Sequence, residues 1–200
     1  SGYFTNTVDF DFTVGTDIHI SNGGGDVFVT KINSDGTYGY TRTFGGNGED
    51  WSNSVELDSS NNIYVTGEFN NTVDFDYGVE IDSHSSNGSN DIFITKINPN
   101  GTYGYTKTFG GSGEDWSNSV ELDSLNNIYL TGRFLNTVDF DFTGGTDNRT
   151  SNGDYDVFVT KINSDGTYGY TKTLGGSGWE DSFSISFDSM HNIYLTGWFQ

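Results

Sequence analysis

The sequence predicts an all-β fold of β-propeller-type blades, each built from four antiparallel strands. The first observation is a seven-residue stretch, Asn6–Phe12, that returns almost unchanged at 71–77 and 136–142, each copy 65 residues after the previous one. The second is the alternation of apolar and acidic residues within that stretch, which is typical of a strand with two different faces. The third is that no segment has the apolar spacing of an amphipathic helix. A fixed period of this length indicates a repeat architecture.

Composition narrows the classes of partner. The net charge of -20 over 200 residues argues against nucleic acid and anionic membrane surfaces, which both require a basic face. The absence of cysteine excludes disulfides and thiolate metal sites. No apolar run is long enough for a membrane span, and no signal peptide begins at Ser1, so we expect any secretion signal to be removed or upstream. Aromatic residues, at 16%, argue against disorder.

Each repeat contains four predicted strands. In the first copy they span 26–33, 37–44, 51–57 and 63–69. The turn at Ser34–Gly36 uses glycine for a positive φ, as hairpin turns often do. The strand at 26–33 is apolar on both faces, and the Asp-rich stretch follows the fourth strand as an accessory segment. We expect the lysines of the both-faces-apolar strand, Lys31, Lys96 and Lys161, to pair with Asp residues of the same or the next blade.

The chain divides into repeat 1 (1–66), repeat 2 (67–131) and repeat 3 (132–200), which form one continuous repeat domain. Repeat 1 holds the last two, outer strands of a first blade and the start of the next, and repeat 3 runs into a further copy. A sheet that is apolar on both faces needs neighbours, which favours stacked blades over the alternative of independent small β-domains. Three blades are too few to close a ring. The chain is therefore expected to be part of a longer array, or of a ring closed by several chains.

Three segments carry a resemblance to a known family: Asp-Val-Phe-Val-Thr-Lys-Ile-Asn at 26–33, Gly-Gly-Asn-Gly-Glu-Asp at 45–50 and Asn-Ile-Tyr-Val-Thr-Gly at 62–67. Together they resemble the bacterial SBBP-type β-propeller repeat, and the resemblance covers the whole chain, three times. It implies a large secreted or surface-attached protein of bacteria or archaea. The motifs specify the repeat type and not an activity, and the number of blades is not transferred from the family.

Nine aspartates are the candidate metal ligands. They recur at three positions of the Asp-rich segment in each repeat: Asp9, Asp11, Asp17, Asp74, Asp76, Asp82, Asp139, Asp141 and Asp147. Ca²⁺ takes about six to eight oxygen ligands, so three carboxylates around one loop are compatible with a calcium site. The alternative is that these carboxylates cap turns by accepting backbone N–H bonds. The spacing does not match the EF-hand pattern.

Trp51 and Trp116 are the candidate ligand-binding residues, because exposed indole rings can serve as sugar platforms. The alternative is that they are wedged between blades, where aromatic residues of propellers usually pack. His19 and His84 align between repeats while His191 does not, so a catalytic metal site built from histidines is not expected.

These observations favour a non-enzymatic extracellular or cell-surface module for structure, adhesion or assembly, with loops stiffened by Ca²⁺. Its expected partners are other copies of itself or further repeats of a longer chain, with glycans or surface proteins as further candidates. The alternative function is a carbohydrate-binding propeller with one shallow site per blade. A hydrolase or lyase is less expected, because near-identical repeats lack the asymmetric constellation that catalysis needs.

Overall fold

The computed structural model covers residues 1–200 and contains only β-strands, arranged in antiparallel sheets, which confirms the predicted all-β class. The first sheet joins β1 (Gly2–Phe4), β4 (Asp26–Ile32) and β5 (Tyr38–Phe44). The second joins β6 (Trp51–Leu57), β7 (Ile63–Asp74), β8 (Ser83–Ile97) and β9 (Tyr103–Phe109). The third joins β10 (Trp116–Leu122), β11 (Ile128–Phe134), β14 (Asp156–Ile162) and β15 (Tyr168–Leu174). The fourth joins β16 (Glu180–Phe187) and β17 (Ile193–Phe199).

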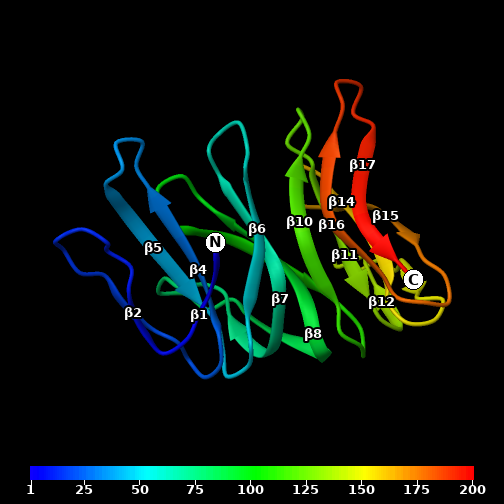
Figure 1. The fold of residues 1–200 in the computed structure, drawn as a ribbon, viewed down its shortest axis with the longest axis horizontal. Helices are drawn as coiled ribbons and strands as arrows, with labels where there is room; N and C mark the ends of the chain where they lie inside the picture. Colours follow the sequence, from blue (N-terminus) through cyan, green and yellow to red (C-terminus); the bar gives the residue numbers. More distant parts are fainter.

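The sheets stand side by side in chain order, as propeller blades do (Figure 1). Within the two complete sheets, consecutive strands pair as neighbours, so each sheet is an antiparallel meander. The predicted turn at Ser34–Gly36 forms: the Gly36 N–H donates to the Asn33 carbonyl at 2.9 Å, and Gly36 has a φ of 83°.

The first sheet differs from the prediction in its number of strands. The sequence predicted two strands of a first blade, and the structure has three, because Gly2, Tyr3 and Phe4 pair with Phe28, Val27 and Asp26 of β4. This short pairing holds because Phe4 is buried, with 6% of its surface exposed. The prediction missed it because a three-residue strand has too few residues to show alternation.

The Asp-rich segment forms a projecting hairpin in each repeat, here called the hairpin arm (residues 6–21, 71–86 and 136–151). The first arm contains β2 (Thr7–Asp9) and β3 (Ile18–Ile20), and the third contains β12 (Thr137–Asp139) and β13 (Asn148–Thr150). In the second repeat, β7 and β8 themselves continue into the arm, with a shift of register between Asn70 and Thr72. Each arm therefore connects the second and third strands of its sheet.

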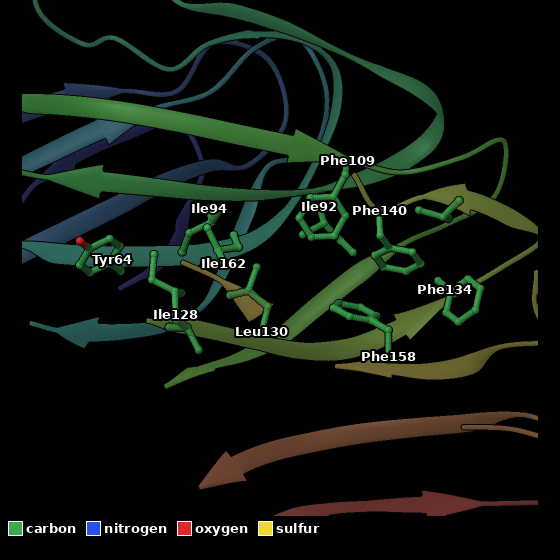
Figure 2. Close-up of a cluster of buried hydrophobic side chains, with 12 residues drawn as sticks. Tyr64, Ile92, Ile94, Phe109, Ile128, Leu130, Phe134, Phe140, Phe158 and Ile162 are labelled. Atoms are coloured by element: carbon green, nitrogen blue, oxygen red, sulfur yellow. The ribbon is translucent and has the colours of Figure 1, made fainter. Parts of the chain in front are cut away.

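The core lies between adjacent sheets. Twelve buried residues from the second and third sheets and the third arm form one cluster, which includes Ile92, Ile94, Leu130 and Phe158 (Figure 2). A second cluster of nine residues lies between the first and second sheets, and a smaller one joins the third and fourth. Burying each large apolar side chain contributes about 1.5–3 kcal/mol, so stacking of the sheets, and not any single sheet, stabilises the fold.

The arms are attached to this core by their apolar face. Val73 and Phe75 of the second arm belong to the cluster between the first two sheets, and Val138 and Phe140 of the third arm belong to the next one. The predicted alternation of the Asp-rich stretch is therefore observed, because its apolar face packs inward while its aspartates face the turn. No helix in the structure is long and apolar enough to cross a membrane.

Candidate functional site

The first two aspartates of each arm hold the backbone of the turn. Asp9 Oδ1 accepts the backbone N–H groups of Asp11 at 3.1 Å and Asp17 at 2.9 Å. Asp11 Oδ1 accepts the backbone N–H of Thr13 at 2.8 Å. The same bonds recur in the other arms, where Asp74 and Asp139 each accept two backbone N–H groups. These contacts match the alternative in which the carboxylates cap turns by accepting backbone N–H bonds.

The third aspartate of each arm ties the arm to the last strand of its own sheet. The hydroxyl of Tyr38, on β5, donates to Asp17 Oδ2. His19 Nε2 lies 3.2 Å from Asp17 Oδ1, and His19 Nδ1 lies 2.9 Å from Thr43 Oγ1. Burial opposes ionisation of Asp17, but the hydrogen bonds from Tyr38 and His19 together outweigh it and hold the pKa of this carboxyl below its ordinary value.

This tyrosine–aspartate anchor is present in all three repeats, as Tyr38–Asp17, Tyr103–Asp82 and Tyr168–Asp147. His84 repeats the role of His19, and Arg149 takes this place in the third arm, with Nη2 at 2.8 Å from Asp147 Oδ1. The sequence analysis missed the anchor. The signal that could have found it is the shared 65-residue period of the tyrosine and the aspartate.

The nine candidate metal ligands lie in three separate arms, and within each arm the carboxylates turn to different partners. No group of three or more His, Cys, Asp or Glu side chains is placed to hold a metal ion. Calcium binding by the arms stays a prediction.

The lysines of the both-faces-apolar strand do not make the predicted ion pairs, because none has a carboxylate within ion-pair distance. Each ammonium instead lies over a tyrosine ring: Lys31 is 5.9 Å from the centroid of Tyr40, and Lys96 is 5.9 Å from that of Tyr64. A tyrosine face attracts a cation and lets the lysine stem cover apolar surface. The prediction was wrong because it considered only carboxylate partners.

Trp51 and Trp116 lie at the same end of adjacent sheets. Trp51 stacks on Tyr3, with ring centroids 4.8 Å apart, and meets Trp116 edge-on at 6.5 Å. The guanidinium carbon of Arg133 lies 3.7 Å from the Trp116 centroid. Both indoles are therefore packed in part. They are also partly exposed, and together they line one cavity of about 380 Å³.

Behind these indoles lies a buried charged cluster that the sequence analysis missed. Arg133 Nη1 is 2.5 Å from Asp181 Oδ2, and the exposed fractions of the two side chains are 10% and 4%. Glu68, on the neighbouring sheet, has 1% of its surface exposed and accepts a hydrogen bond from Asn53 Nδ2 at 2.7 Å. Burial raises the pKa of Glu68 to about 8.

Two strand edges carry unpaired backbone. On β4, the residues 26–28 pair with β1, while the edge from Val29 to Ile32 has no partner strand on that side. On β17, the whole edge opposite β16 is unpaired. The edge of β4 borders an apolar cavity of about 540 Å³, lined in part by Ile32, Val55 and Leu57. Unpaired edges beside apolar surface are templates for strand addition.

Comparison with known proteins supports a repeat architecture and does not identify a family. No family model matches the sequence, so membership of the SBBP-type family stays a prediction. The chain is 24% identical over 169 residues to an uncharacterized WD repeat-containing protein of Acanthamoeba polyphaga mimivirus. The match covers 72% of this chain and 12% of that protein. Together with the stacked four-stranded sheets, this likeness is in keeping with propeller-type repeats.

Proposed function

We propose that the chain is a non-enzymatic, repeat-based interaction module whose partner is a second copy of itself. The observation that carries the proposal is the match between the two unpaired edges, β4 at one end of the stack and β17 at the other. The likeness to a WD repeat-containing protein supports a repeat-based module. An extracellular or cell-surface location, a structural or adhesive role, and stiffening of the arms by Ca²⁺ are further parts of the proposal.

The register of the complete sheets predicts how the two edges would pair. Tyr64 of β7 lies opposite Lys96 of β8, and Tyr129 of β11 lies opposite Lys161 of β14. The equivalent residues on the unpaired edges are Tyr194 of β17 and Lys31 of β4. In the proposed dimer, Tyr194 of one copy therefore lies opposite Lys31 of the other.

The apolar cavity beside β4 supports the same arrangement. The ring of Tyr129 packs on Phe187 of the next sheet, with centroids 4.8 Å apart. Two sheets back along the stack, the residue equivalent to Phe187 is Leu57, which lines the cavity and is 51% exposed. Tyr194 is itself 59% exposed. Pairing of β17 with β4 would place this ring on Leu57 and bury both side chains.

One strand competes with this pairing. In the repeat register, Gly197–Phe199 of β17 would occupy the positions on β4 that Gly2–Phe4 of β1 occupy. Association therefore displaces a three-residue strand and replaces it with a seven-residue one, which forms more backbone hydrogen bonds and buries more apolar surface.

Sedimentation velocity over a range of concentrations tests the proposal. We expect species larger than 21.9 kDa, increasing with concentration and with added salt, which screens the net charge of -20 on each copy. Leu57→Asp places a charge in the cavity and should shift the protein to monomer. Leu125→Asp is the matched control, because Leu125 is 72% exposed in the turn between β10 and β11. A strictly monomeric wild-type chain would contradict the proposal.

A further inference from the structure

The cavity between Trp51 and Trp116 has the lining of a ligand site. Besides the two indoles it is lined by Asn47, Asn70 and Asn90 and by Glu49. Its volume is about 380 Å³, within the range of small-molecule sites. Asn70 Nδ2 donates to Asn90 Oδ1 at 3.2 Å, and Glu49 Oε2 accepts the indole N–H of Trp51 at 3.2 Å. Apolar ring surface and oriented polar groups therefore meet in one place.

The otherwise similar repeats differ at this cavity. The residues that pack the sheets together are repeated nearly unchanged, as in Phe28, Phe93 and Phe158. One repeat further along, Glu49 and Trp51 are retained as Glu114 and Trp116, but four cavity residues are replaced: Asn47 by Ser112, Asn70 by Leu135, Asn90 by Tyr155 and Trp116 by Asp181. The packing that all blades share therefore does not explain why these residues occur at the cavity.

In the next repeat, large side chains occupy the equivalent space. The ring of Tyr155 lies 5.2 Å from that of Trp179, and the Tyr155 hydroxyl donates to Glu114 Oε2 at 2.9 Å. Arg133 lies 5.0 Å from the Tyr155 ring and 5.2 Å from the Trp179 ring. The open arrangement is therefore specific to the junction that holds both Trp51 and Trp116.

We propose that this cavity is a carbohydrate-binding site for an uncharged pyranose. The indole surface that Tyr3 and Arg133 leave uncovered suits the apolar C–H surface of a sugar ring, and the three amides and the Glu49 carboxylate can bond its hydroxyls as donors and acceptors. The net charge of -20 and Glu49 at the rim disfavour sulfated or carboxylated sugars. This site is independent of the strand edges proposed for self-association. It also differs from the sequence-based alternative of one shallow site per blade, because this chain has a single such site.

An array of immobilised neutral glycans, with sulfated and carboxylated glycans alongside, identifies a probe. The strongest neutral binder is then titrated in solution by calorimetry and by tryptophan fluorescence. We expect saturable binding of one sugar per chain and a change in tryptophan emission. Absence of binding by every neutral glycan, or binding of the acidic glycans alone, would overturn the proposal.

The next repeat suggests a variant that should fill the cavity and keep the fold. Asn90→Tyr introduces the residue found at the equivalent position 155, and Glu49 stands where Glu114 accepts the Tyr155 hydroxyl. We expect unchanged melting and at least about a tenfold loss of affinity, as when a central contact of a site is lost. Trp51→Ala should weaken binding similarly.

Ser60→Leu is the matched control, since it also exchanges one repeat's residue for another's but lies in the turn after β6, beyond the opposite end of that strand from Trp51. Full affinity in the control and lost affinity in Asn90→Tyr support the site. Full affinity in a folded Asn90→Tyr protein overturns it. Sedimentation of the same variants keeps the two proposals separate, because neither substitution touches β4 or β17.

Discussion

Arg133 covers one face of Trp116, with its guanidinium carbon 3.7 Å from the ring centroid, while its Nη1 bonds Asp181 on the following sheet. Arg133 thus packs on Trp116 within the third sheet and joins that sheet to the fourth by its ion pair with Asp181. Both charged groups are almost fully buried. Such a pair is strongly coupled, because losing one member leaves the other charged and unsolvated.

Arg133→Met should therefore lower the free energy of unfolding by about 3–5 kcal/mol, as breaking a buried pair does. The double variant Arg133→Met with Asp181→Leu should regain most of this loss, since no uncompensated charge remains. Urea denaturation measures both. Arg149→Ala is the control: its ion pair with Asp147 is more exposed, so we expect less than about 1 kcal/mol. Equal losses in the two single variants would contradict the role given to Arg133.

Glu68 should make stability depend on pH between about 4.5 and 8. Its folded pKa of about 8 lies above the ordinary value of 4.5, so the folded state holds the proton more tightly than the unfolded state. The stability that this group contributes is fully present below about pH 4.5 and is lost as the pH rises through about 8. We expect Glu68→Gln to come within about 1 kcal/mol of the wild type at pH 5 and to exceed it by roughly 4 kcal/mol at pH 9.

Urea denaturation at both pH values measures this difference. Glu80→Gln serves as the control, because Glu80 is exposed in the second arm. If Glu68→Gln changes stability by the same amount at both pH values, Glu68 does not hold a proton in the folded protein.

Asp74 should stabilise the second arm by capping its turn. Its Oδ1 accepts the backbone N–H groups of Asp76 at 3.2 Å and Asp82 at 3.0 Å. Asp74→Ala leaves both donors to water, and we expect a loss of about 1–2 kcal/mol. Amide hydrogen exchange should show faster exchange at positions 76 and 82, with the sheet strands unaffected. If the exchange rates of these two amides do not change, Asp74 does not cap the turn.

The calcium proposal makes a separate prediction for the arms. EDTA should lower the Tm and added calcium should restore it, since a bound ion stabilises only the folded state. Asp76→Asn should weaken this response while keeping the turn, because the Asn oxygen can still accept the Gly78 N–H that Asp76 Oδ1 accepts at 2.7 Å. If EDTA does not change the Tm, the calcium proposal is contradicted and the carboxylates only cap the turns.

Much of the fold could be predicted from local pattern. The strand predicted at 51–57 coincides with β6, and that at 26–33 exceeds β4 by one residue. The alternation in Thr7–Phe12 also predicted which face of the arm packs inward. These features depend on neighbours in sequence, which a periodic pattern reports directly.

The rest depends on contacts between residues that are distant in sequence. Nothing near Arg133 indicates that Asp181 will lie beside it, because the pairing arises only when the third and fourth sheets stack. The left-handed backbone of Asn6, Asn71 and Asn136, each with φ between 62° and 66°, is set by the sharp entry into the arm. Asparagine tolerates that conformation, but its presence alone does not predict it.

Self-association through β4 and β17 is tested most directly by a cross-link, because the chain has no cysteine of its own. In the repeat register, Lys31→Cys and Tyr194→Cys bring two thiols opposite each other across the interface of two copies, within reach of a disulfide. We predict a disulfide-linked dimer or larger oligomer under mild oxidation. Thr30→Cys with Tyr194→Cys is the control, since a shift of one residue puts the thiols on opposite faces and should abolish the link. Equal cross-linking in both pairs, or in neither, would contradict the proposed pairing.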